Sequence, residues 1–217
     1  MGGTVKIAYW DTAQGNPPRL VGQIRGTPTI KFIAPSKKNK KNSNKKKTVS
    51  DYNGERKAEA MLSFASSMMP NFVTKINDGQ KGMEKFLAKA DKYALPTILT
   101  VTKSPGGLDP VTKALSTEFR RRALVAEIKL TKKNIALIES FGIDDWISDS
   151  SHKVKTAVLS RKEDGTFVAM RKNSEIAKFS FSRAKAFMKK FALEKPYYED
   201  EKAQAKLSAR ESGREEL

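Results

Sequence analysis

The sequence predicts an α/β fold, because stretches typical of β-strands alternate with stretches typical of helices along most of its 217 residues. Three strand signals are the clearest: TVKIAYW at 4–10, TILTVT at 97–102 and LVAEIKL at 124–130 are rich in β-branched and other apolar residues. The helix candidates between such stretches repeat apolar residues at intervals of three and four. A chain of this length forms one large domain or two small ones.

The first part of the chain ends at residue 70. In chain order we expect a strand at 4–10, a short helix at 16–24, a strand at 27–35, an edge strand within 48–55 and a helix at 55–69. Two prolines after Asn16 suit a helix N-terminus. Pro70 and Asn71 end the last helix, so we place a domain boundary after residue 70.

The second part has a more complete order, β-α-β-α-β-α followed by β-β-α. We expect strands at 72–76, 97–102, 124–130, 154–160 and 166–172, and helices at 80–93, 111–122, 134–141 and 182–192. Asp164-Gly165 predicts a hairpin turn between the last two strands. Residues 71–193 are therefore predicted to form a complete domain, and the charged residues 194–217 a solvated helix or tail.

The formal net charge of +18 is partly concentrated in one place. Between Ser36 and Thr48 the chain reads KKNKKNSNKKK, seven lysines with only Asn and Ser between them, which predicts a disordered loop over residues 36–48. Arg120, Arg121 and Arg122 are expected in the last turn of a helix. The lysine run could attract RNA or an anionic surface, but it lacks the aromatic and arginine side chains of a specific nucleic-acid reader.

The composition excludes most catalytic chemistry. Without cysteine the chain has no disulfide, no thiol nucleophile and no thiolate metal site, and its one histidine, His152, argues against a Ser-His-Asp triad. Gly106-Gly107 lacks the spacing of a phosphate-binding loop. The acidic runs at 144–145 and 199–201 have no partner for acid/base work, and a solvated face or a weak calcium contact accounts for them. We therefore predict no catalytic residue, no metal site and no cofactor.

Two further features concern membranes. No apolar run approaches the length of a membrane-spanning helix. Met1–Thr4 lacks the basic start and the apolar stretch of a secretory signal. We predict no membrane span.

One motif carries a resemblance to a known family. Gly26-Thr27-Pro28-Thr29-Ile30 with Lys31-Phe32, followed by Tyr52-Asn53-Gly54 and Arg56, resembles the G-x-P-T-I-x-F … Y-x-G-x-R stretch of protein disulfide isomerases. The order of strands and helices is similar to that of their thioredoxin-like domains. The resemblance implies that Pro28 follows a cis peptide bond and that the backbone of Thr27 faces substrate peptides. Thr27 and Pro28 are thus the candidate substrate-binding residues.

The sequence also departs from that family. A family domain begins with β-α-β and carries Cys-x-x-Cys, whereas this chain starts at what looks like the third strand. We therefore expect residues 1–70 to form the C-terminal half of a thioredoxin-like domain, either as a fragment of a longer precursor or as a degenerate half-domain. We favour the fragment, with further sequence upstream that carries the cysteines and a signal peptide. Residues 71–193 resemble a non-catalytic thioredoxin-like domain. Lys103–Gly107 stands where the redox motif would be, and Lys155-Thr156 stands in place of a cis-proline.

The last four residues suggest a targeting signal. Arg214-Glu215-Glu216-Leu217 resembles the Lys-Asp-Glu-Leu signal of the endoplasmic reticulum. We expect a protein of the endoplasmic reticulum lumen that assists protein folding, with client polypeptides and the retrieval receptor as partners. The full-length protein would catalyse thiol-disulfide exchange, and this chain alone would only bind polypeptide. The alternatives are a redox-inactive chaperone or scaffold, and a basic module for RNA or anionic surfaces.

Overall fold

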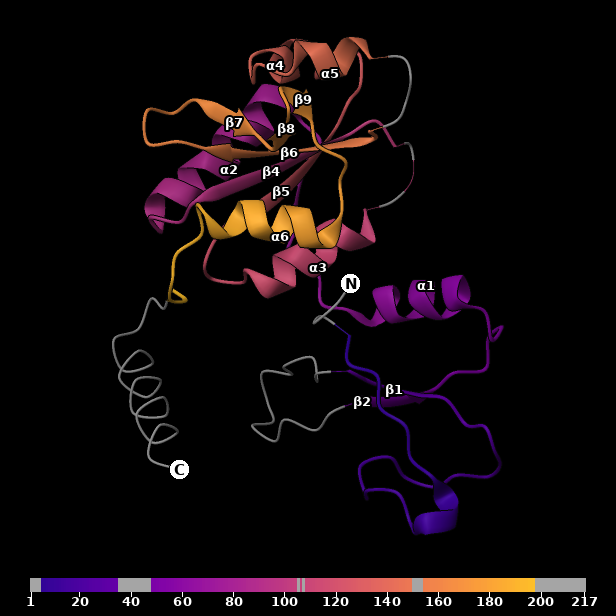
Figure 1. Cartoon of the computed structure of the whole chain (residues 1–217). Helices are drawn as coiled ribbons and strands as arrows, with labels where there is room; N and C mark the ends of the chain where they lie inside the picture. Colours follow the sequence, from indigo (N-terminus) through magenta and orange to yellow (C-terminus); the bar gives the residue numbers. More distant parts are fainter. Residues whose placement is uncertain (1–4, 35–47, 105, 107, 150–153, 198–217) are drawn as a thin grey trace. The chain divides into compact units, whose positions relative to one another are not determined.

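The computed structural model describes residues 5–34, 48–104, 106, 108–149 and 154–197 (Figure 1). Most of the lysine-rich stretch, His152, Glu199–Glu201 and the C-terminal Arg214–Leu217 lie outside the described residues. The chain divides into two compact units between Pro70 and Asn71. Each unit is described here by itself.

The larger unit is built on a five-stranded mixed sheet. Its strands are β3 (Thr74–Ile76), β4 (Thr97–Thr102), β5 (Leu124–Lys129), β6 (Thr156–Arg161) and β7 (Phe167–Ala169). The spatial order is β3-β5-β4-β6-β7, with β3, β5 and β4 parallel to one another and β6 and β7 antiparallel to their neighbours. A parallel half joined to an antiparallel half in this order is the arrangement of a thioredoxin-like fold. The predicted fold class is confirmed.

Helices cover both faces of this sheet (Figure 1). They are α2 (Gly79–Lys92), α3 (Pro110–Glu118), α4 (Ile135–Glu139), α5 (Asp144–Ser148) and α6 (Phe181–Lys189), and a hairpin of β8 (Arg171–Lys172) and β9 (Glu175–Ile176) precedes α6. Helices α3 and α6 pack together on one face, and α2, α4 and α5 contribute to the core on the other. Within the described ranges, no helix combines the length and the apolar character needed to cross a bilayer.

The hydrophobic core follows the alternation of side chains along the strands. Leu99 and Val101 of β4 pack with Met83 and Phe86 of α2 on one face of the sheet. Ile98 points to the opposite face, because successive strand residues alternate. All six residues of β4 are buried, as expected for a strand with neighbours on both edges and helices on both faces.

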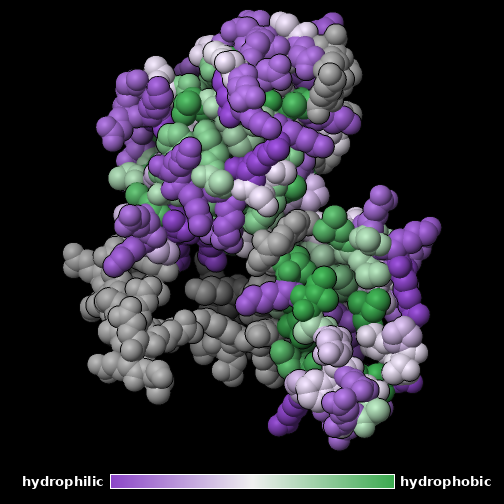
Figure 2. All heavy atoms as spheres, viewed as in Figure 1, coloured by the Kyte–Doolittle hydropathy of each residue, from purple (hydrophilic) through white to green (hydrophobic). Residues whose placement is uncertain are grey.

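The smaller unit has a two-stranded antiparallel sheet and one α-helix. They are β1 (Lys31–Ala34), β2 (Thr48–Asp51) and α1 (Ala58–Met68), preceded by a short 3-10 helix, η1 (Thr12–Gln14). Three aromatic rings, Phe32, Tyr52 and Phe64, meet edge to face with centroids 4.8 to 5.7 Å apart. Hydrophobic residues also gather on the visible surface of this unit (Figure 2).

Two predicted elements of the smaller unit are wrong. The segment 6–10 is not a strand, because within the described residues no neighbouring strand pairs with it, and an extended segment needs such pairing. The helix expected at 16–24 is absent. Pro17-Pro18 pushes the preceding backbone away from the helical region, and Gly22, with φ of 72°, ends a turn that starts at Pro18.

The larger unit also differs from the prediction in places. Helix α3 ends at Glu118, so the three arginines at 120–122 do not occupy its last turn. Arg121 has φ of 64°, and Arg122 donates from Nε to the carbonyl of Leu193 at 2.6 Å. These contacts form a turn that holds the chain after α6. The strand expected at 166–172 is interrupted at Met170, which divides it into β7 and β8. Helix α5 and β9 were not predicted, because each is very short.

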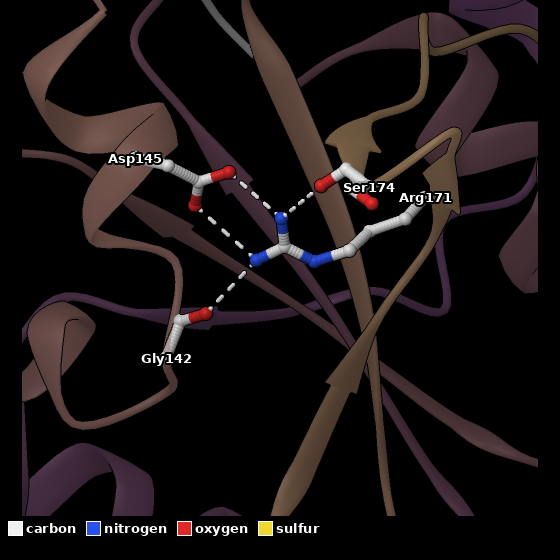
Figure 3. Close-up of polar contacts among 4 residues, drawn as sticks. All are labelled: Gly142, Asp145, Arg171 and Ser174. Atoms are coloured by element: carbon white, nitrogen blue, oxygen red, sulfur yellow. Dashed lines mark hydrogen bonds and ion pairs between the residues drawn. The ribbon is translucent and has the colours of Figure 1, made fainter.

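An arginine clamp joins the β8–β9 hairpin to α5 and to the turn that precedes α5 (Figure 3). The Nη1 atom of Arg171 lies 2.7 Å from Oδ2 of Asp145, and its Nη2 atom lies 3.2 Å from Oδ1. The same guanidinium donates to the carbonyls of Ser174 (2.6 Å) and Gly142 (3.1 Å). The hydrogen bond from Arg171 lowers the pKa of Asp145.

The Arg171→Lys variant tests this clamp. A lysine has one ammonium group and cannot keep two parallel bonds to a carboxylate, so the free energy of unfolding should fall by roughly 0.5–1 kcal/mol at pH 7. Because the folded pKa of Asp145 is lowered, its contribution exists above the unfolded pKa and disappears as pH falls through the folded value. Urea unfolding at neutral and acidic pH measures the difference, and Lys172→Gln is the matched control on the same exposed hairpin. An equal loss in both variants would contradict the prediction.

Candidate functional site

Thr27 and Pro28 lie on the surface of the smaller unit, just before β1. The peptide bond between them is cis, as the resemblance implies. Both residues are exposed. The hydroxyl of Thr29 donates to the carbonyl of Gly26 across this bond. The motif in the sequence therefore identified an exposed turn at Thr27-Pro28, next to the start of β1.

Arg56 supports this turn from a distant part of the sequence. Its Nη2 atom donates to the carbonyl of Pro28 at 3.1 Å. Arg56 follows a tight loop in which the Tyr52 hydroxyl donates to the carbonyl of Glu55 at 2.6 Å. The motif Tyr52-x-Gly54-x-Arg56 thus has a physical role. It folds the chain after β2 so that the guanidinium reaches the Thr27-Pro28 turn.

Gly54 is needed because of close approach to an aromatic ring. A Cβ atom at this position would lie 2.7 to 2.9 Å from atoms of the Tyr52 side chain. The ring cannot move freely, because it packs against Phe32 and Phe64. A larger residue at position 54 would disturb both the aromatic cluster and the loop that carries Arg56.

The smaller unit exposes an unusual amount of apolar side chain. Among the described residues, six of the eight large hydrophobic residues with high exposure belong to it: Ile7, Tyr9, Trp10, Leu20, Ile33 and Leu62. Ile7 and Tyr9 are 94% and 95% exposed. This group, which we name the apolar patch, fits an interaction surface better than isolated exposed residues would.

One edge of β1 is also open. Among the described residues β1 pairs only with β2. The Tyr52 amide donates to the Ile30 carbonyl at 2.9 Å, so Ile30 belongs to a hydrogen-bonded pair of this ladder. Because such pairs alternate in antiparallel sheets, Lys31 and Ile33 direct their backbone groups to the other edge. Ile33 therefore offers a backbone donor and acceptor next to an apolar side chain.

In the larger unit, the place expected for the redox motif holds a tethered lysine. The Nζ atom of Lys103 donates to the carbonyls of Trp146 and, at 2.8 Å, Asp149, and it lies 4.6 Å from the centre of the Trp146 ring. Burial lowers the pKa of Lys103, and the charge of Asp149 opposes this effect. The side chain ties the end of β4 to the end of α5, which is a structural role.

Lys155-Thr156, where the resemblance would place a cis-proline, belongs to the same region. The Lys155 carbonyl accepts from the Lys103 amide at 2.8 Å. No second cis bond occurs in the described part of the chain. Residues 105 and 107 of the predicted loop are outside the description.

A buried acid lies beside this loop and was missed by the sequence analysis. Glu127 of β5 is only 4% exposed, and its Oε2 atom accepts from the Asp109 amide at 3.3 Å. Asp109 caps α3, because its Oδ1 accepts from the Val111 amide at 2.7 Å. Burial raises the pKa of Glu127. An acid inside the apolar run LVAEIKL was the signal that could have identified it.

A metal site is not found among these groups. Within the described ranges, no three His, Asp or Glu side chains gather closely enough to hold an ion. Asp145, one of the paired acids considered above, is engaged by Arg171. The structure thus brings together Thr27, Pro28 and Arg56, and it places Lys103 and Glu127 in the other unit.

Comparisons with known proteins assign the chain to no family. No protein-family model and no curated protein matches the chain. Among solved structures, the crystal structure of ERdj5 form II is similar with a TM-score of 0.37 and 15% sequence identity. The match covers 65% of this chain and 18% of that chain.

The Glu127→Gln variant tests the buried acid. Because the folded pKa is raised, the wild-type protein loses stability as pH rises above the unfolded pKa and through the folded one. Glutamine keeps an acceptor for the Asp109 amide and has no charge, so the variant should gain about 1 kcal/mol relative to the wild type at pH 8. Urea unfolding between pH 5 and pH 8 measures this. A stability difference that is constant with pH would contradict it.

The Gly54→Ala variant tests the loop that carries Arg56. The added methyl group would overlap the Tyr52 ring and destabilise the smaller unit by roughly 1–3 kcal/mol. Hydrogen exchange of the Tyr52 amide, which bonds to Ile30, reports this locally. Gly26→Ala is the control, since nothing lies within 4 Å of a Cβ there. Unchanged exchange in Gly54→Ala would show that the ring is free to move.

Proposed function

We propose that this chain binds unfolded polypeptide and assists protein folding, as a relative of the protein disulfide isomerases. It contains no cysteine, so it cannot exchange disulfides by itself. Thiol-disulfide exchange, the reaction of that family, would depend on cysteines outside this chain. A thiol turnover assay on these 217 residues should give no signal.

The observation that carries the proposal is the open edge of β1 beside the apolar patch. An extended peptide can add a strand to such an edge, where main-chain hydrogen bonds give affinity without requiring a particular sequence. The exposed Ile33 and the nearly fully exposed Ile7 and Tyr9 offer contacts for apolar side chains. Both properties suit unfolded clients, which expose backbone and apolar groups together.

Thr27 and Pro28 are proposed as part of this binding surface. They lie at the surface directly before Ile30 and β1, so a peptide that pairs along β1 would reach them. Arg56 is a positioning residue here, because it holds the Pro28 carbonyl and leaves the exposed side of the turn accessible. The thioredoxin-like fold of the larger unit agrees with a role in the same family.

We also propose the endoplasmic reticulum lumen as the location. The support is the resemblance of Arg214–Leu217 to a retrieval signal, and the retrieval receptor would be a second partner. A redox-inactive chaperone would fit the same surfaces. The two hypotheses, part of a disulfide-exchanging protein and a redox-inactive chaperone, differ in whether the chain works together with reactive cysteines of a longer protein.

Binding of a labelled, reduced and unfolded protein to the full chain tests the proposal. The double variant Ile7→Ser with Tyr9→Ser should weaken binding roughly three- to tenfold, because the lost contacts are apolar. Its folding should be unaffected, since both side chains are almost completely exposed. Ile135→Ser, an exposed apolar site of the larger unit, is the matched control and should bind like the wild type.

A second pair of variants tests the strand edge. Ile33→Pro removes the amide that faces the open edge, and proline is tolerated on edges of this kind. Ile33→Thr keeps that amide and the preference for strand. Proline should weaken binding about tenfold more than threonine, given several main-chain hydrogen bonds at stake. If all these variants bind as the wild type does, this surface is not the binding site.

A further inference from the structure

Four lysines form a single row along the exposed face of α2. Lys81, Lys85, Lys89 and Lys92 follow one another at intervals of four, four and three residues. At 3.6 residues per turn they fall within an arc of about 80°. The buried residues of the same helix, Met83, Phe86 and Ala90, lie on the opposite side. We name these four residues the lysine row.

The lysine row is not neutralised within the described part of the chain. None of its members forms an ion pair there, although all are exposed. The two acids inside the helix are engaged elsewhere. Glu84 accepts from Gln80 at 3.1 Å, and Asp91 pairs with Arg161 at 2.8 Å. Glu84 lies three residues after Lys81, but the order with the acid first is the more stabilising one, and neither acid lies three or four residues before a lysine.

This arrangement works against the stability of the helix. Lys81 with Lys85, and Lys85 with Lys89, are like charges at the i, i+4 spacing, which repel one another. Lys81 also lies in the first turn, where a positive charge opposes the helix dipole. Lys89 and Lys92 in the last turn are favourable for the same reason. A solvated helix end therefore accounts for the last two lysines but not for the first two.

We propose that the lysine row binds an acidic polypeptide segment that presents carboxylates at the same spacing. Successive lysines are separated along the axis by about 6, 6 and 4.5 Å, from a rise of 1.5 Å per residue. Glutamates four residues apart on a helix have the same 6 Å repeat. Carboxylates placed beside the lysines would offset the repulsion between neighbouring ammonium groups.

Other anionic partners fit the row less well. Within α2 the exposed face has no aromatic ring on which a nucleic-acid base could stack, and the ring of Tyr93 at its end already contacts Lys92 (Nζ 5.3 Å from the ring centre) and Tyr197. It has no large apolar side chain that could enter a bilayer beside the charges. Glu84 and Asp91 flank the row on one side, so a broad anionic surface would meet two carboxylates as well as the lysines. A single file of carboxylates would avoid them.

The test uses the full chain and a helical peptide with glutamates at positions i, i+4, i+8 and i+11 and uncharged residues elsewhere. Fluorescence anisotropy should show binding that weakens as salt rises. Replacing all four lysines of the row by glutamine should weaken it at least about tenfold at low salt. The control variant removes four exposed positive charges elsewhere on the same unit, at Lys162, Lys178, Lys189 and Lys190, and should bind nearly as the wild type does.

Further measurements separate the alternatives. A peptide of the same composition with its glutamates in one block should bind several-fold more weakly if spacing matters. Without peptide, the row variant should unfold at a higher temperature than the wild type at low salt, because the repulsion is gone. Equal loss of binding in the row and control variants would reduce the effect to net charge. Tighter binding of a single-stranded RNA or of phosphatidylserine vesicles to the row would likewise overturn the proposal.

This inference does not depend on the proposed function. The lysine row belongs to the larger unit, whereas the open edge of β1 and the apolar patch belong to the smaller one. The variants of the lysine row should not change the binding of unfolded protein, and the variants of Ile7, Tyr9 and Ile33 should not change the binding of the acidic peptide. The two results can therefore succeed or fail separately.

Discussion

The need of every strand for hydrogen-bonded neighbours governs both halves of this protein. In the larger unit β4 pairs with β5 on one side and with β6 on the other, and helices cover both faces of the sheet. Its backbone groups are satisfied and its six side chains are buried. Among the residues that the structure describes in the smaller unit, the same requirement is met only on one side of β1. The five-stranded sheet of the larger unit supplies a stable scaffold. The unpaired edge of β1 in the smaller unit supplies a surface that can accept another strand.

Two ionisable side chains of the larger unit are partly or fully buried. In the larger unit Lys103 lies between the end of β4 and α5, and Glu127 of β5 lies beside the N-terminus of α3; burial disfavours the charged form of each. Lys103 is compensated by two carbonyls and an aromatic ring, whereas Glu127 accepts a single bond of 3.3 Å from the Asp109 amide. Burial therefore shifts the two pKa values in opposite directions, each toward the neutral form. These contacts hold the chain together in the part of the larger unit where a non-catalytic domain was expected, with Lys103 at the position of the family's redox motif.

Sequence patterns predicted the elements whose stability is local or whose burial is complete. The first and last residues predicted for the strand TILTVT are those of β4, and the hairpin predicted at Asp164-Gly165 is present between β6 and β7. Patterns failed where the outcome depends on a distant partner: residues 6–10 have strand composition, but no strand among the described residues pairs with them. The candidate site divides in the same way. The motif pointed to Thr27, Pro28 and Arg56, but the bond from Arg56 to the Pro28 carbonyl spans 28 residues and required the fold.

Positive charge limits what an open, apolar edge can do. A strand edge beside exposed Ile33 would ordinarily invite a second copy of the chain to pair with it. Seven lysines lie between β1 and β2 in the sequence, and the whole chain carries +18, so two copies that approach through this edge repel one another. A neutral or acidic extended polypeptide meets no such barrier. Electrostatics therefore favours foreign polypeptide over self-association at the same backbone groups, and this selectivity should weaken as salt screens the lysines.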